Sequence, residues 1–175
     1  MTARIALIGG QGWPLTETPA GLPALSARFK ARGVEVQTYA HDARQAIRDW
    51  LHGFKGFRGE IGDSLGAGSA GLFPGDLEGD VDFAGGFQPS DWDPIAQGPL
   101  TDRVVVVAKN VRFAHCIWNP AFVETGGLGN AHYVITPGSK TILTTTEHHG
   151  THPDDWGYSQ DLMFNHVMQL IGTKP

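Results

Sequence analysis

The chain has 175 residues, of which 41% are hydrophobic and 18% are charged, and its formal net charge is -5. This length suits one domain with one hydrophobic core. A net negative charge disfavours binding to a phosphate backbone, so nucleic acid is not an expected partner. No part of the sequence holds the about 18 to 20 consecutive apolar residues that a membrane helix requires.

The N-terminus and the cysteine content bear on the cellular compartment. The apolar start MTARIALIGG is too short for a signal peptide, so the chain as written is expected in the cytoplasm. A phage protein or an exported protein is the alternative context. Cys116 is the only cysteine, which excludes an internal disulfide. Its setting, FAHCIWN, is typical of a small buried residue.

The first third of the sequence alternates between strand and helix patterns. Residues 4–10 (RIALIGG) predict a buried strand, and residues 20–33 place apolar side chains at helical spacing before a glycine. Residues 34–39 (VEVQTY) predict a second strand. Residues 42–53 predict a second helix, with Asp42 as its N-cap.

The next segment, GFRGEIGDSLGAGSAGLF at 56–73, predicts a short strand, a sharp turn at 62–66 and a helix of small residues. Arg58, Gly59 and Glu60 interrupt the apolar run that is expected of a strand in the middle of a sheet. This strand therefore has the poorest propensity of the predicted set.

The remaining elements continue the α/β pattern. We predict a strand at 81–87, a loop at 88–103, one or two strands within 103–119, a last strand at 141–147 and a final helix at 159–172. Such alternation implies a mostly parallel sheet with helices on both faces. The expected fold is a three-layer α/β/α sandwich in a single domain spanning residues 1–175, with functional groups at the carboxyl ends of the strands.

The turn Gly62-Asp63-Ser64-Leu65-Gly66 fits the pattern G-x-S-x-G. In this pattern, flanking glycines allow a strained strand-to-helix turn that exposes a serine at a helix N-terminus. A serine hydroxyl becomes a strong nucleophile only when a base removes its proton and N–H donors meet the oxyanion. The alternative is a tight turn in which Ser64 only caps the helix.

The segment IGDSLGAGSA, which follows two βα units, resembles the nucleophile elbow of the α/β-hydrolase fold, and the resemblance spans most of the chain. It implies a minimal, lidless, cutinase-like serine esterase. It also implies an oxyanion hole formed by the backbone N–H of Leu65 and that of Gln11 or Gly12. A phosphate-binding turn is the alternative for this early loop, but the G-x-G-x-x-G spacing is missing and Pro14 conflicts with a helix start.

The resemblance also implies a histidine base between the last strand and the last helix. His148, His149 and His152 lie in that interval, within TTTEHHGTHPDDWGY. We predict His152, which is followed by Pro153, as the base, with His149 as the alternative. A metal site is a third interpretation, because His148 and His152 are four residues apart, but a third ligand is not evident and no metal is predicted. A solvated loop is the fourth.

A carboxylate that orients the histidine is implied after the strand that follows the elbow helix, or after the next strand. Gln88 stands at the first such position, and Asp91 and Asp93 follow it. Glu124 follows the next strand region. We predict Asp91, with Asp93 and Glu124 as alternates. Both aspartates also fit ordinary loop chemistry, in which the side chain bonds to its own turn.

GDSL also resembles the opening block of the SGNH hydrolases, and GTHPDDWGY resembles their closing D-x-x-H-P block. In this chain GDSL follows two βα units instead of the first strand, and His149 stands where the closing aspartate belongs. The order of elements favours the α/β-hydrolase fold. Both resemblances imply the same pair, Ser64 with His152.

These observations predict a serine hydrolase that cleaves small-molecule or polymer esters through an acyl-enzyme, without a cofactor. Four aromatic residues are candidates for the walls of the substrate pocket, with burial in the core as their alternative: Trp13, Trp92, Trp118 and Phe122. The competing hypothesis is an inactive, hydrolase-like binding or structural module. It draws on the lack of a clear acid and on the polar strand before the elbow. The oligomeric state stays open.

Overall fold

The computed structural model describes residues 2–10, 21–87, 89, 104–118, 132–134, 140–145 and 153–173. The elements in chain order are β1 (Ala3–Ile8), α1 (Leu22–Lys30), β2 (Glu35–Tyr39), α2 (Arg44–Leu51), β3 (Phe57–Asp63), α3 (Leu65–Leu72), the 3-10 helix η1 (Phe73–Asp76), β4 (Val81–Phe87), β5 (Val104–Val106), β6 (Val111–Trp118), β7 (His132–Val134), β8 (Lys140–Thr145) and α5 (Pro153–Thr173).

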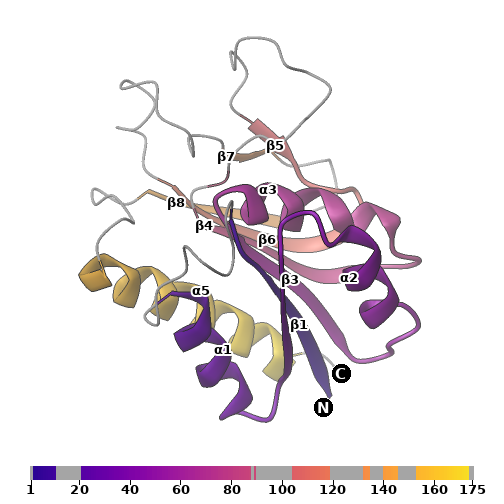
Figure 1. The fold of residues 1–175 in the computed structure, drawn as a ribbon, viewed down its shortest axis with the longest axis horizontal. Coiled ribbons are helices and arrows are strands. Elements are labelled where there is room, and N and C mark those ends of the chain that lie inside the picture. Colours follow the sequence, from indigo (N-terminus) through magenta and orange to yellow (C-terminus); the bar gives the residue numbers. More distant parts are fainter. Residues whose placement is uncertain are drawn as a thin grey trace.

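Six strands form the central sheet in the order β2-β1-β3-β4-β6-β8, and every neighbouring pair is parallel. Figure 1 shows this sheet with helices on both of its sides. The expected α/β fold is therefore confirmed. The chain runs from β1 outward to β2 and then returns past β1 to β3, so the connections leave the β1–β3 boundary in opposite directions. Such a boundary is the usual ligand site of an open parallel sheet.

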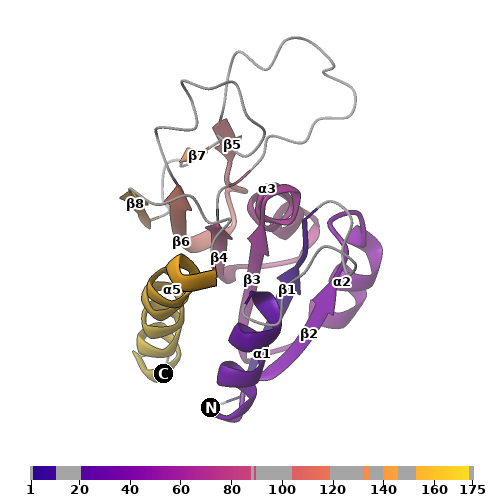
Figure 2. The ribbon, with the colours of Figure 1, turned by 60° about the vertical axis from the view of Figure 1, so that its left-hand side comes forward.

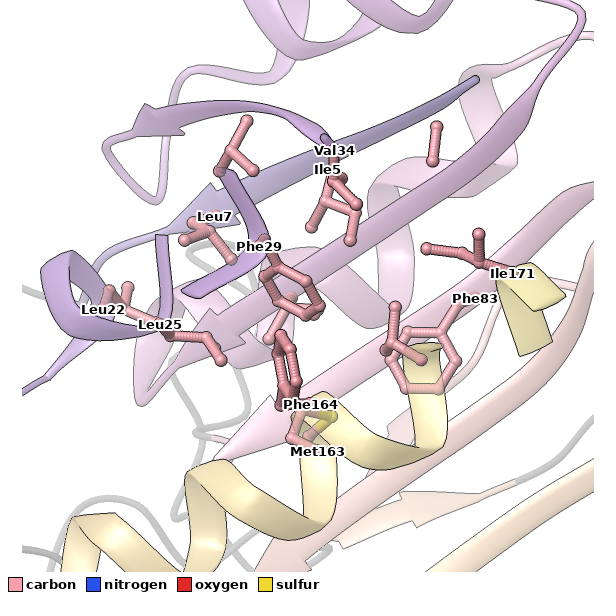
Figure 3. Close-up of a cluster of buried hydrophobic side chains, with 14 of the residues drawn as sticks. Ile5, Leu7, Leu22, Leu25, Phe29, Val34, Phe83, Met163, Phe164 and Ile171 are labelled. Atoms are coloured by element: carbon pink, nitrogen blue, oxygen red, sulfur yellow. The ribbon is translucent and has the colours of Figure 1, made fainter. Parts of the chain in front are cut away.

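Two hydrophobic clusters cover the two faces of the sheet, because successive side chains of a strand point to opposite faces. Ile5 and Leu7 of β1 pack under α1 and α5, whereas Ala6 and Ile8 face the side of α2 and α3. Figure 2 shows the two helix pairs separated by the strands. In Figure 3 the rings of Phe29 and Phe164 join α1 to α5, with centroids 5.1 Å apart.

The polar strand that precedes the elbow does lie in the middle of the sheet, as β3, between β1 and β4. The guanidinium of Arg58 donates hydrogen bonds to the carbonyl oxygens of Glu78 and Asp80. Glu60 is completely buried, and its carboxyl oxygens have no hydrogen-bond partner within the described part of the chain. Burial raises the pKa of Glu60 well above its ordinary value, so a neutral carboxyl group occupies this position.

Several boundaries differ from those predicted. The N-cap of α2 is Ala43 rather than Asp42, and no side chain caps this helix. β5 does not join the central sheet but pairs with β7 in a separate two-stranded parallel sheet. The final helix begins six residues earlier than predicted, at Pro153. None of the helices that the structure describes has both the length and the apolar character needed to cross a membrane.

Candidate functional site

Ser64 stands between β3 and α3 in a strained backbone conformation, with φ 53° and ψ -118°. Among the described residues it is the only non-glycine with a positive φ. Such a conformation costs about 1–3 kcal/mol and persists only where the surrounding structure enforces it. Residues 63–65 are half-buried, whereas the rest of β3 and the body of α3 are buried. The turn therefore brings a strained serine to the surface, as a nucleophile elbow does.

The two glycines of the motif are required by close backbone contacts. A Cβ atom on Gly62 would overlap the carbonyl group of Gly66, and a Cβ atom on Gly66 would overlap the carbonyl group of Ile8. These contacts press the first turn of α3 against the ends of β3 and β1. The pattern G-x-S-x-G is therefore a packing requirement of this turn, which only glycine satisfies at both positions.

Backbone hydrogen bonds hold the serine in place. The N–H of Ser64 donates to the carbonyl of Phe87 at the end of β4, at 2.9 Å. The carbonyl of Ser64 accepts from the N–H groups of Ala67 and Gly68, at 3.1 and 3.2 Å. The side chain of Ser64 makes no capping hydrogen bond to α3. Ser64 thus occupies the N-cap position of α3, but its hydroxyl does not cap the helix, and the strain is not compensated in that way.

The end of β1 lies beside the serine side chain. A Cβ atom on Gly10 would be 3.1 Å from Cβ of Ser64 and 3.6 Å from its Oγ. Ser64 thus stands at the β1–β3 boundary, where the connections diverge. Leu65 is the first residue of α3, and N–H groups in a first helical turn have no acceptor within the helix. Gln11 and Gly12, the other predicted oxyanion donors, lie outside the described residues.

The other predicted site residues are not placed by the structure. Trp118 is the last residue of β6, and its side chain is not described. The rest of the predicted set lies outside the described residues: His149, His152, Asp91, Asp93, Glu124, Trp13, Trp92 and Phe122. α5 begins directly after His152. Figure 2 shows α5 starting at the edge of the sheet toward which the arrowheads of β3 and β4 point.

Small residues of the sheet form the surface on which α3 packs. In register across four strands lie Ala6, Glu60, Ala84 and Ala114, and one pleat further lie Ile8, Gly62, Gly86 and Cys116. Six of these eight residues are alanine, glycine or cysteine, the larger two being Glu60 and Ile8, and we call the eight the small-residue platform. α3 itself consists of glycine, alanine and serine between its two leucines. Glycine at Gly62 and Gly66 lets the backbone of α3 approach those of β3 and β1 closely.

Cys116 of the platform is a buried free cysteine, as its sequence setting indicated. Burial raises its pKa to about 12. The thiol is therefore protonated near neutral pH and is a poor nucleophile.

Tyr133 of β7 also packs at the platform, and sequence reasoning missed it. Its ring is almost fully buried, and its hydroxyl donates to the carbonyl of Ala67 at 2.6 Å. The two residues are 66 positions apart, so no local pattern in the sequence predicts the contact.

A pair of histidines lies on the opposite face of the sheet. The Nδ1 atoms of His115 on β6 and His166 on α5 are 3.2 Å apart. Burial lowers the pKa of both rings, that of His115 to about 4, with a further lowering from His166. One neutral ring therefore donates its Nδ1 proton to the other. In the part of the chain that the structure describes, no three His, Cys, Asp or Glu side chains are grouped to hold a metal ion.

Comparisons of the chain with models of known protein families, with curated proteins and with solved structures found no match. The residues and their geometry are therefore the only basis for an assignment of function.

Proposed function

We propose that the protein is a serine hydrolase that cleaves carboxylic esters through an acyl-enzyme formed on Ser64. The observation that carries the proposal is the strained backbone of Ser64, with φ 53°, in a turn that requires glycine at Gly62 and Gly66. The position of this turn at the β1–β3 boundary supports it, because open parallel sheets bind their ligands at such a boundary.

In the proposed reaction, Oγ of Ser64 attacks the ester carbonyl carbon while its proton passes to the imidazole of His152. The backbone N–H of Leu65, with that of Gln11 or Gly12, stabilises the oxyanion. The bond to the alcohol then breaks as the alcohol takes the proton from the imidazole. Water repeats the sequence on the acyl-enzyme and releases the acid. Asp91, or its alternates Asp93 and Glu124, orients the imidazole.

The placement of α5 supports a histidine from the preceding connection as the base. Nε2 of Gln160 in α5 donates to the carbonyl of Gly21, which directly precedes α1, at 3.1 Å. The N-terminal half of α5 is thus tied to the start of α1, and α1 follows the strand that ends beside Ser64. His152 directly precedes α5. His149 is the alternative base in the same connection.

Labelling with a fluorophosphonate probe tests the proposal. Wild-type protein should form a covalent adduct that mass spectrometry locates on Ser64, and Ser64→Ala should not react. Ser26→Ala, which changes a buried serine of α1, is the matched control and should label like wild type. A panel of p-nitrophenyl esters measures turnover in parallel. Wild-type protein that neither labels nor cleaves any ester contradicts the proposal and favours the inactive module.

A further inference from the structure

The two-stranded β5–β7 sheet packs directly on the elbow helix. A Cβ atom on Gly71 of α3 would lie 2.7 Å from Cγ1 of Val105 and 3.3 Å from the ring of Tyr133. A Cβ atom on Gly86 of β4 would lie 2.6 Å from the Tyr133 hydroxyl oxygen. Glycine at these two positions therefore leaves the space in which the tyrosine ring stands between α3 and the central sheet.

The hydroxyl of Tyr133 reaches the turn that holds the serine. The hydroxyl donates to the carbonyl of Ala67 at 2.6 Å. The N–H of Ala67 in turn donates to the carbonyl of Ser64 at 3.1 Å. Burial, with Cys116 and Glu60 nearby, raises the pKa of Tyr133 well above its ordinary value. The phenol is therefore protonated near neutral pH, and its hydroxyl is available as a donor.

The first turn of α3 depends on such hydrogen bonds more than an ordinary helix does. Large side chains usually fix the position of a helix by interlocking with their neighbours. The residues of α3 that face the platform are glycine, alanine and serine, and they interlock little. Polar contacts supply the missing restraint: Tyr133 on the carbonyl of Ala67, and Oγ of Ser69 on the carbonyl of His41 at 2.6 Å.

We infer that Tyr133 is a positioning residue of the Ser64 site. Its hydroxyl fixes the first turn of α3, and with it the N–H of Leu65, against β7. The inference rests on the proposed function for its effect on catalysis, but the mechanical restraint on α3 is independent of it.

Tyr133→Phe keeps the ring and removes the hydrogen bond. We expect kcat for a p-nitrophenyl ester to fall about tenfold or more with KM within twofold, because misplaced oxyanion donors weaken the transition state more than the bound substrate. The rate of fluorophosphonate labelling should fall in parallel. Ile171→Val, which removes a buried methyl group late in α5, is the control. It should destabilise the protein about as much as Tyr133→Phe does, and it should leave kcat and the labelling rate unchanged.

Hydrogen exchange separates this inference from the proposed function. In Tyr133→Phe, amides at 65–68 should exchange about fivefold faster than in wild type, while those of α5 should not change. If wild-type protein has no esterase activity, the exchange rates still decide whether Tyr133 restrains the turn. Unchanged exchange at 65–68, or a kcat equal to wild type in an active enzyme, overturns the inference.

If Tyr133→Phe does not fold, Gly86→Ala provides the same test. It displaces the hydroxyl without removing it, and it should produce the same two effects.

Discussion

At Ser64 the protein retains a backbone conformation that disfavours any side chain, although glycine at this position would relieve the strain. The flanking contacts of Gly62 and Gly66 enforce the conformation, so relaxation would require α3 to move away from the sheet. Strain that is maintained in this way at a half-buried serine is consistent with the nucleophile proposed for this position.

Two substitutions at Ser64 measure the strain directly. Within a helix or strand, glycine normally makes a protein less stable than alanine does, by about 0.5–1 kcal/mol. At Ser64 the order should reverse, with Ser64→Gly more stable than Ser64→Ala by about 1 kcal/mol, because only glycine adopts the positive φ without cost. Urea denaturation of the two variants gives the difference. A Ser64→Ala protein that is the more stable of the two would show that the turn is unstrained.

Glu60 presents a different cost, that of a neutral carboxyl group in the core. Its folded-state pKa is raised above the ordinary value of 4.5, so the folded protein binds a proton that the unfolded chain releases. Folding stability from this group is fully present below pH 4.5. It is lost as the pH rises toward the raised pKa, by up to about 1.4 kcal/mol per pH unit.

Glu60→Gln should remove this titration. The free energy of unfolding of the variant, relative to wild type, should increase steadily with pH above 4.5, because only the wild type loses stability from this site. Denaturation in urea at pH 5, 6, 7 and 8 gives the comparison. A difference between the two proteins that does not depend on pH would mean that Glu60 is ionised in the folded state.

Among the elements, α5 is attached to the sheet partly through the His115–His166 pair. Both folded-state pKa values are lowered, so the unfolded chain binds more protons. The pair contributes its full stability above about pH 6.5, the ordinary pKa of histidine. This contribution decreases as the pH falls toward about 4, the folded-state pKa of His115. Acid should therefore weaken the packing of α5.

Replacing both rings tests this expectation. His115→Leu combined with His166→Leu removes both partners of the hydrogen bond, a change that leaves stability at neutral pH nearly unaltered when the shape is kept. The double variant should lose less stability than wild type between pH 6.5 and 4, as measured by thermal unfolding. Equal losses in the two proteins would place the acid sensitivity elsewhere in the chain.

The elements differ in how far a single sequence can predict them. β1, β2 and α1 follow from local periodicity, and the structure contains them as expected. The polar strand β3 was difficult because its polar side chains are accommodated by distant partners: Arg58 by carbonyls near residue 80, and Glu60 by losing its charge. β5 reads as a core strand by composition, but its place on α3 depends on tertiary packing.

At the scale of the whole molecule, the strand order places the end of β1 and the Ser64 turn at one boundary of the sheet. The turn was predictable because its sequence pattern is local: two glycines, a serine and a helix of small residues. The contribution of Tyr133 was not, since its contact with Ala67 spans 66 positions. The predicted base and acid stay predictions, because their residues lie outside the described ranges.

The small-residue platform also determines how the protein tolerates mutation. Its members come from four strands spread over more than 100 positions, and α3 packs on three of these strands, β1, β3 and β4. A larger side chain at Ala84 of β4 would displace α3 and, with it, Ser64. A change that looks conservative, such as alanine to valine, can therefore disturb the Ser64 turn from a position far away in the sequence. The geometry of this turn therefore limits substitution in the sheet more strictly than the fold alone would.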